Sequence, residues 1–73
     1  MLKYLVIEIQ TNANGTVGNI VSSYDALNAA ESKYHTVLAA AAISALPEHA
    51  AVLMTSRGQV LETKWYQHEV VSE

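Results

Sequence analysis

The sequence predicts an α+β fold in which a four-stranded, mainly antiparallel sheet carries one alanine-rich helix on one face, in the order ββαββ. Three observations support this prediction. Segments rich in β-branched and large apolar residues lie on both sides of a long alanine-rich segment, an Asn-Gly pair separates the first two of them, and a glycine-containing turn separates the last two. The 73 residues are enough for one domain, which we assign to residues 1–73.

The first predicted hairpin uses residues 2–10 and 17–24 as strands. The first strand is rich in strand-forming residues and contains no breaker. Asn14 and Gly15 follow it, and both tolerate the positive φ that tight hairpin turns require. Gly18 and the asparagine after it weaken the second strand, which we therefore expect to be short, bulged or at a sheet edge.

The predicted helix runs from Asp25 to Ala45. Alanine is the best helix former, and Pro47 pushes the residue before it out of the helical conformation. Asp25 can cap the start of the helix; alternatively Asn28 caps it and Glu31 completes a capping box. The residues expected to face the sheet recur at helical spacing and are Leu27, Ala30, Tyr34, Val37, Leu38, Ala41 and Ala45.

The second predicted hairpin uses residues 50–55 and 60–70 as strands. Both segments are rich in valine, leucine and other residues that favour strands. Between them Gly58 stands in a Ser-Arg-Gly-Gln turn, at a position where a positive φ is expected.

Large apolar side chains should point to both faces of the sheet. In the first strand Leu5, Ile7 and Ile9 point one way, and Tyr4 and Val6 point the other. One helix is about 10 Å across and four strands span about 19 Å, so the helix covers about half of one face. A contiguous apolar surface that stays open usually marks an interface, most simply with a second copy about a two-fold axis. We therefore expect a homo-oligomer, most simply a dimer, that works by protein contact.

The residues at this contact can be predicted from their apolar character and their place in the strands. We expect the contact to use Tyr4, Val6, Met54 and Tyr66. If two helices pair instead, the contact uses residues of the outer helix face, Ala40 and Ile43. Alternatively the face of the sheet away from the helix stays exposed to water, because its polar residues make it hydrophilic. These residues are Glu8, Glu62, Lys64 and His68.

Composition excludes several classes of function. The chain has no cysteine, which excludes disulfides and thiolate metal sites. With 51% hydrophobic and 15% charged residues it is too apolar for a disordered chain. The N-terminus lacks the layout of a signal peptide, and Glu8 interrupts its apolar run too early for a membrane span. We expect a cytoplasmic protein that does not bind membranes.

Nucleic-acid binding is a less favoured expectation. Four scattered basic residues stand against seven acidic ones, whereas phosphate binding needs clustered positive charge. Trp65 and Tyr66 could stack on the bases of a single strand, which would make the chain a nucleic-acid accessory protein. Without a basic surround, a role in a core or an interface is the better interpretation of both aromatic residues.

A metal or small-molecule site is the other alternative. Glu31 and His35 stand at i, i+4 on the predicted helix, a spacing that puts both on one face. A third ligand would have to come from His68 or from His49, which we expect in a surface loop after Pro47. Because a metal needs three or four ligands, a solvated polar face is the favoured interpretation. We predict no cofactor, no catalytic residue and no enzyme activity.

Five segments carry a resemblance to a known group of proteins. They are residues 3–10, 14–18, 30–35 and 38–42, and the C-terminal pair Tyr66 and His68. These segments are spread along the sequence, and through them the whole chain resembles a family of small uncharacterised proteins of gut Firmicutes and of their phages and mobile elements. The family has no assigned activity, so the resemblance implies no catalytic residue. It implies an accessory protein that acts by binding.

Overall fold

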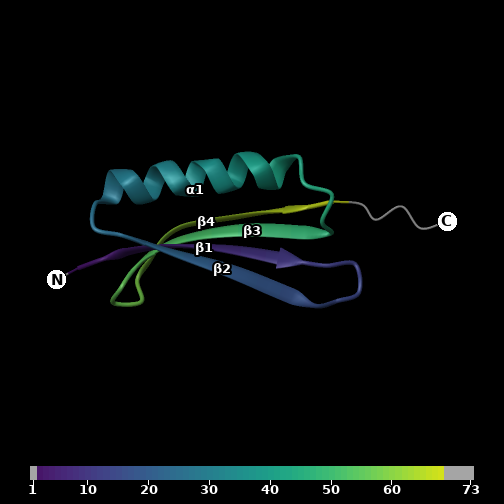
Figure 1. Cartoon of the computed structure of the whole chain (residues 1–73), viewed down its shortest axis with the longest axis horizontal. Helices are drawn as coiled ribbons and strands as arrows, with labels where there is room; N and C mark the ends of the chain where they lie inside the picture. The colour runs from purple at the N-terminus through teal and green to yellow at the C-terminus, as the bar shows by residue number, and fades with distance from the viewer. Residues whose placement is uncertain (1, 69–73) are drawn as a thin grey trace.

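The computed structural model describes residues 2–68, which form two layers, a four-stranded sheet and one helix on one of its faces (Figure 1). This arrangement confirms the predicted α+β fold and its ββαββ order. The end of the last predicted strand, at Val70, lies outside the described residues. In chain order the elements are β1 (Tyr4–Thr11), β2 (Val17–Tyr24), α1 (Leu27–Ala42), β3 (Glu48–Thr55) and β4 (Val60–Gln67).

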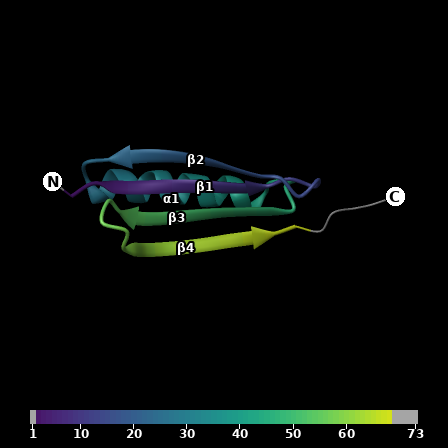
Figure 2. The ribbon, with the colours of Figure 1, turned by 90° about the horizontal axis from the view of Figure 1, so that it is seen from below.

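The strands follow the order β2-β1-β3-β4, with every neighbouring pair antiparallel (Figure 2). Two hairpins therefore lie side by side, and their first strands form the centre of the sheet. Val6 pairs with Leu53 across this central seam. The hairpin turns place Gly15 at φ 88° and Gly58 at φ 89°, the left-handed conformation that was expected for both.

Helix α1 begins two residues later than predicted. Its N-cap is Ala26, which has no side-chain acceptor for the free amides of the first turn. Asp25 does not cap the helix, because its carboxylate forms an ion pair with Lys3 at the same end of the sheet. Both predicted caps, Asp25 and Asn28, are therefore wrong.

The helix ends at Ala42, three residues before the predicted end. The amides of Ile43 and Ser44 bond the carbonyls of Ala40 and Ala41, which tightens the last turn. Strand β3 already begins at Glu48, so the chain needs the intervening residues to turn back to the sheet. The position of the next strand, rather than Pro47 alone, sets the end of the helix.

The core lies between α1 and the two central strands. Its buried cluster consists of Val6, Ala30, Tyr34, Val37, Ala51 and Leu53. The predicted inner face of the helix is confirmed at its centre, whereas Leu27 is 40% exposed and Ala45 lies beyond the helix. Alanine at two of the six core positions lets the helix lie close to the sheet but buries little surface.

Candidate functional site

One side of the sheet faces away from α1, and within residues 2–68 no helix or loop covers it (Figures 1 and 2). Side chains alternate between the two sides of a strand, and paired residues of neighbouring strands share a side. The pairing register therefore assigns the residues of this side, which we call the open face. Its apolar members are Leu5, Ile7, Ile9, Val17, Val21, Ala50, Val52, Met54, Val60 and Trp65.

The open face is most exposed along its two outer strands. Val17 and Val21 in β2, and Val60 and Trp65 in β4, are each more than half exposed. The isoleucines of β1 are half-buried because neighbouring strands flank them on both sides. Exposed apolar side chains that adjoin one another in this way form a patch of the kind that marks binding surfaces.

Charged residues lie only at the two ends of the open face within the described part of the chain. The Lys3–Asp25 ion pair and Arg57 of the β3–β4 turn lie at one end. Glu48, which pairs with Thr11, lies at the opposite end. Between them the polar residues of this face are uncharged. The middle of the open face can therefore be covered without removing a charge from water.

A bulge in β4 increases the apolar content of this face. Leu53 pairs with Glu62, whereas the next residue, Met54, pairs with Val60, so one extra residue is inserted in β4. Val60 therefore points to the same side as Trp65, where strict alternation would place them on opposite sides. The sequence gives no signal for this bulge.

The predicted contact residues are divided between the two sides of the sheet. Met54 lies on the open face, but Tyr4, Val6 and Tyr66 lie on the side that carries α1. Val6 is 1% exposed inside the core, so its predicted place on an open surface is wrong. The cause is the register of the central seam, which pairs Val6 with Leu53 and so sets it opposite to Met54.

The alternative contact residues of the helix are both accessible. Ala40 lies on the outer side of α1, and Ile43, the C-cap residue, is 88% exposed. They are not part of a broad apolar surface, since two other exposed residues of the helix, Ala29 and Thr36, are small or polar.

The polar residues that were expected to keep the second face wet lie on the helix side. Glu8, Glu62 and Lys64 alternate with the residues of the open face and therefore point away from it. His68 bonds through Nε2 to the carbonyl of Ala41 at the end of α1, at 2.7 Å. The expectation of a hydrated second face made by these four residues is wrong.

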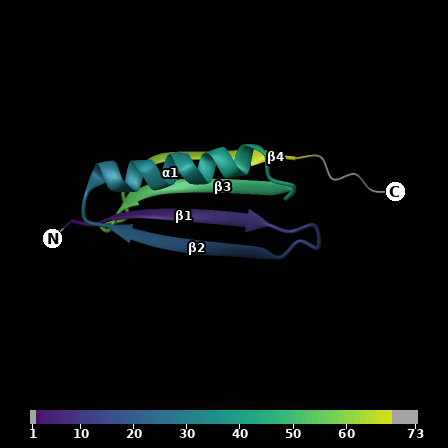
Figure 3. The same cartoon turned by 45° about the horizontal axis from the view of Figure 1, so that its top comes forward.

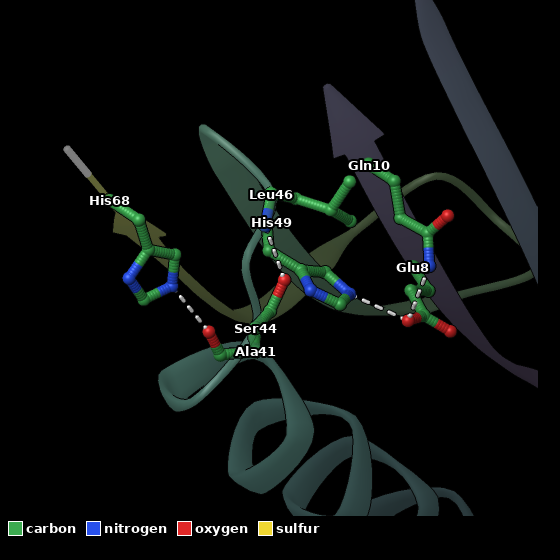
Figure 4. A network of polar contacts seen from close by, with 7 residues as sticks. All are labelled: Glu8, Gln10, Ala41, Ser44, Leu46, His49 and His68. Carbon is green, nitrogen blue, oxygen red and sulfur yellow. Dashed lines mark hydrogen bonds and ion pairs between the residues drawn. The ribbon is translucent and has the colours of Figure 1, made fainter. Parts of the chain in front are cut away.

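A second candidate site is a half-buried polar cluster beside the C-terminal end of α1 (Figure 4). His49 Nε2 lies 2.6 Å from a carboxylate oxygen of Glu8, and Gln10 Nε2 donates to the same oxygen at 3.1 Å. His49 is 4% exposed and belongs to β3, so its predicted place in a surface loop is wrong. Alternation backwards from the buried Leu53 and Ala51 could have revealed it.

This polar cluster links the two central strands. Glu8 and Gln10 lie in β1 and His49 in β3, and the contact runs diagonally across the seam between them. His49 Nδ1 is buried and has no hydrogen-bond partner among the described residues. No pocket opens beside it within residues 2–68. Because its contacts join β1 to β3, the cluster fits a structural role in fixing the register of these two strands.

The predicted metal ligands are not brought together. His68 contacts the end of α1 near Ala41, whereas Glu31 lies ten residues earlier, about 15 Å along the helix axis. His35 is exposed on α1, and its ring lies in a T-shaped arrangement with the ring of Tyr34. The part of the chain that the structure describes contains no group of three side chains able to hold a metal ion.

The two neighbouring aromatic residues of β4 point to opposite sides. Trp65 belongs to the open face, and Tyr66 lies on the helix side, where its ring stacks on His68 with 6.5 Å between ring centres. Burial raises the pKa of the nearby Tyr34 hydroxyl, and Glu62 and Tyr66 add to this shift. Since Tyr66 lies on the helix side, Trp65 is the one large aromatic ring of the open face among the described residues, whereas single-stranded nucleic acids usually need several.

Comparison with known proteins adds no relative. No family model, no curated protein and no solved structure matches this chain. No helix within the described residues combines the length and the apolar character that a membrane span needs.

Proposed function

We propose that this chain is a non-enzymatic, cytoplasmic binding module that holds another protein surface against the open face of its sheet. The observation that carries the proposal is the uncovered apolar face opposite α1 (Figure 2). Within residues 2–68, ten apolar residues from all four strands contribute to it, and charges lie only at its ends. Removing such a surface from water costs little desolvation free energy, and each apolar side chain that is buried contributes favourable binding free energy.

The small core supports the same proposal. Within the described residues the fully buried hydrophobic residues number seven, and three of them are alanine. A single core rarely gives a chain of this size much stability, and association is a common additional source. Burial of the open face would give the sheet a second apolar layer, similar in width to the core layer between the sheet and α1.

The polar groups favour binding over catalysis. The buried histidine and carboxylate engage each other, and no pocket adjoins them within residues 2–68. A net charge of −3 and one aromatic ring on the open face favour a protein partner over nucleic acid. The proposed module also fits the accessory role, on a phage or mobile element, that the family resemblance implies.

Position-specific photocrosslinking in the native host tests the proposal. A photoreactive amino acid at Ile9, on the open face, should give a defined protein adduct, because the partner lies within reach of the sheet. The matched position is Ala40 on the outer side of α1, which should give none. Adducts from Ala40 alone, or from neither position, would contradict the proposal.

A further inference from the structure

We infer that the surface held by the open face is that of a second copy of this chain, stacked sheet on sheet about a two-fold axis. This inference rests on the proposed function, because it names the partner of the same face. Three features of the open face carry it: its area, the placement of its end charges and the fit of the side chains of β4 and of its centre.

The area matches what a stable dimer needs. Each strand has eight residues, so the face measures about 26 Å along the strands and about 19 Å across them. Its projected area is about 500 Å², and two such faces in contact bury at least about 1,000 Å², since side chains add relief. Specific protein interfaces begin at about 1,000 Å² and are commonly about 1,600 Å².

The charges select one orientation of the two copies. Arg57 lies at the end where Lys3 and Asp25 neutralise each other, and Glu48 lies at the opposite end. If the two-fold axis lies between the two sheets and runs across the strands, the strands of one copy run opposite to those of the other. This arrangement brings Arg57 of each copy to Glu48 of the other. An axis along the strands would place like charges together, which costs binding free energy.

The side chains fit the same orientation. In β4, Val60 and Trp65 stand near opposite ends of the open face with the small Thr63 between them. When the strands of the two copies run in opposite directions, Trp65 of one copy packs against Val60 of the other. By symmetry this contact occurs twice in the dimer. Ile7 and its partner Val52 lie at the centre of the face, next to the axis. Two sheets stacked in this way lie about 10 Å apart with strands about 30° from alignment.

The first experiment measures mass and tryptophan emission against concentration. Light scattering should give twice the mass of one chain at high concentration and the monomer mass on dilution. The emission of Trp65, which is the single tryptophan, should shift to the red on dilution because its ring returns to water. A monomer at high concentration, with an unshifted emission, overturns the inference.

Substitutions on the two sides of the molecule locate the contact. Ile7→Lys should raise the dimer dissociation constant at least about 100-fold, because both copies place a lysine beside the axis. Far-UV circular dichroism should stay unchanged, since Ile7 is not part of the buried cluster. The matched control Ala40→Lys, on the outer side of α1, should leave the dimer intact. The reverse pattern would show paired helices and overturn the inference.

Charge reversal tests the orientation without touching the apolar centre. Arg57→Glu and Glu48→Arg should each weaken the dimer several-fold at low salt, and the double variant should restore it. If the double variant instead weakens the dimer by the sum of the two single effects, stacking with reversed strands is overturned. A dimer that survives both Ile7→Lys and these changes uses another surface, such as the uncharged edge strand β2, and overturns the inference.

Photocrosslinking from Ile9 separates this inference from the proposed function. An adduct of twice the chain mass supports both. An adduct with a different protein, together with a monomer in light scattering, retains the proposed function and overturns the second copy as its partner. No adduct at all contradicts both.

Discussion

Leu53→Ala tests whether the small core under α1 carries the stability of the single chain. Leu53 is 1% exposed and packs in the buried cluster with Val6 and Val37. Losing three buried carbons costs about 2.4 kcal/mol at about 0.8 kcal/mol each, and the cavity left behind raises this to about 3–4 kcal/mol. A chain of this length is stable by about 4–11 kcal/mol, so one substitution removes a large part of the total.

Urea unfolding followed by circular dichroism measures this loss. The midpoint should fall while the slope stays constant, because the native fold is unchanged. Met54→Ala is the matched control, since Met54 is the next residue along β3 but points to the open face. At a dilution where the chain is monomeric it should cost less than about 1 kcal/mol, because the side chain is only half-buried. Equal losses at the two positions would refute the assignment of the two sides of the sheet.

Three further predictions concern the polar cluster, the buried tyrosine and the first turn. His49→Ala should lower the free energy of unfolding by about 2–3 kcal/mol, because Glu8 stays half-buried without its partner; an unchanged urea midpoint would contradict this. The raised pKa of Tyr34 favours its neutral form in the folded chain, so its contribution to stability is present below its ordinary pKa of 10.0 and is lost as the pH rises through the folded value. Tyr34→Phe should therefore show a smaller loss of stability between about pH 9 and about pH 11 than the parent chain, and equal slopes would contradict the assignment. Gly15→Ala should cost about 1 kcal/mol because φ is 88°, whereas Gly18→Ala, at an ordinary φ with open space around it, should cost nothing.

The fold could be predicted from the sequence because its signals are local. Strand composition, the Asn-Gly turn and the alanine-rich segment each act over a few residues, and all three agree. The inner helix residues Ala30, Tyr34, Val37 and Ala41 follow from helical spacing alone and are buried as predicted. The two sides of β1 were also separated correctly by alternation.

The open face could be predicted to exist, but its members could not. Which side of β1 meets the helix depends on its register against β3, and no turn links these two strands to fix it. A shift of one residue in such a register exchanges the two sides, and the apolar character of Val6 and Tyr66 is compatible with either side. The bulge between Val60 and Glu62 in β4 and the buried pair of Glu8 and His49 are likewise products of tertiary packing.

The central seam between β1 and β3 also shapes how the chain folds. The two strands are about 44 residues apart in sequence, whereas each hairpin and the helix form from neighbouring residues (Figure 3). Joining them requires closure of a long loop, so this step should limit the folding rate. Until it occurs, both hairpins expose apolar strand edges that can pair with other chains. Substitutions at the seam should therefore slow folding, while those in the outer strands should mainly speed unfolding.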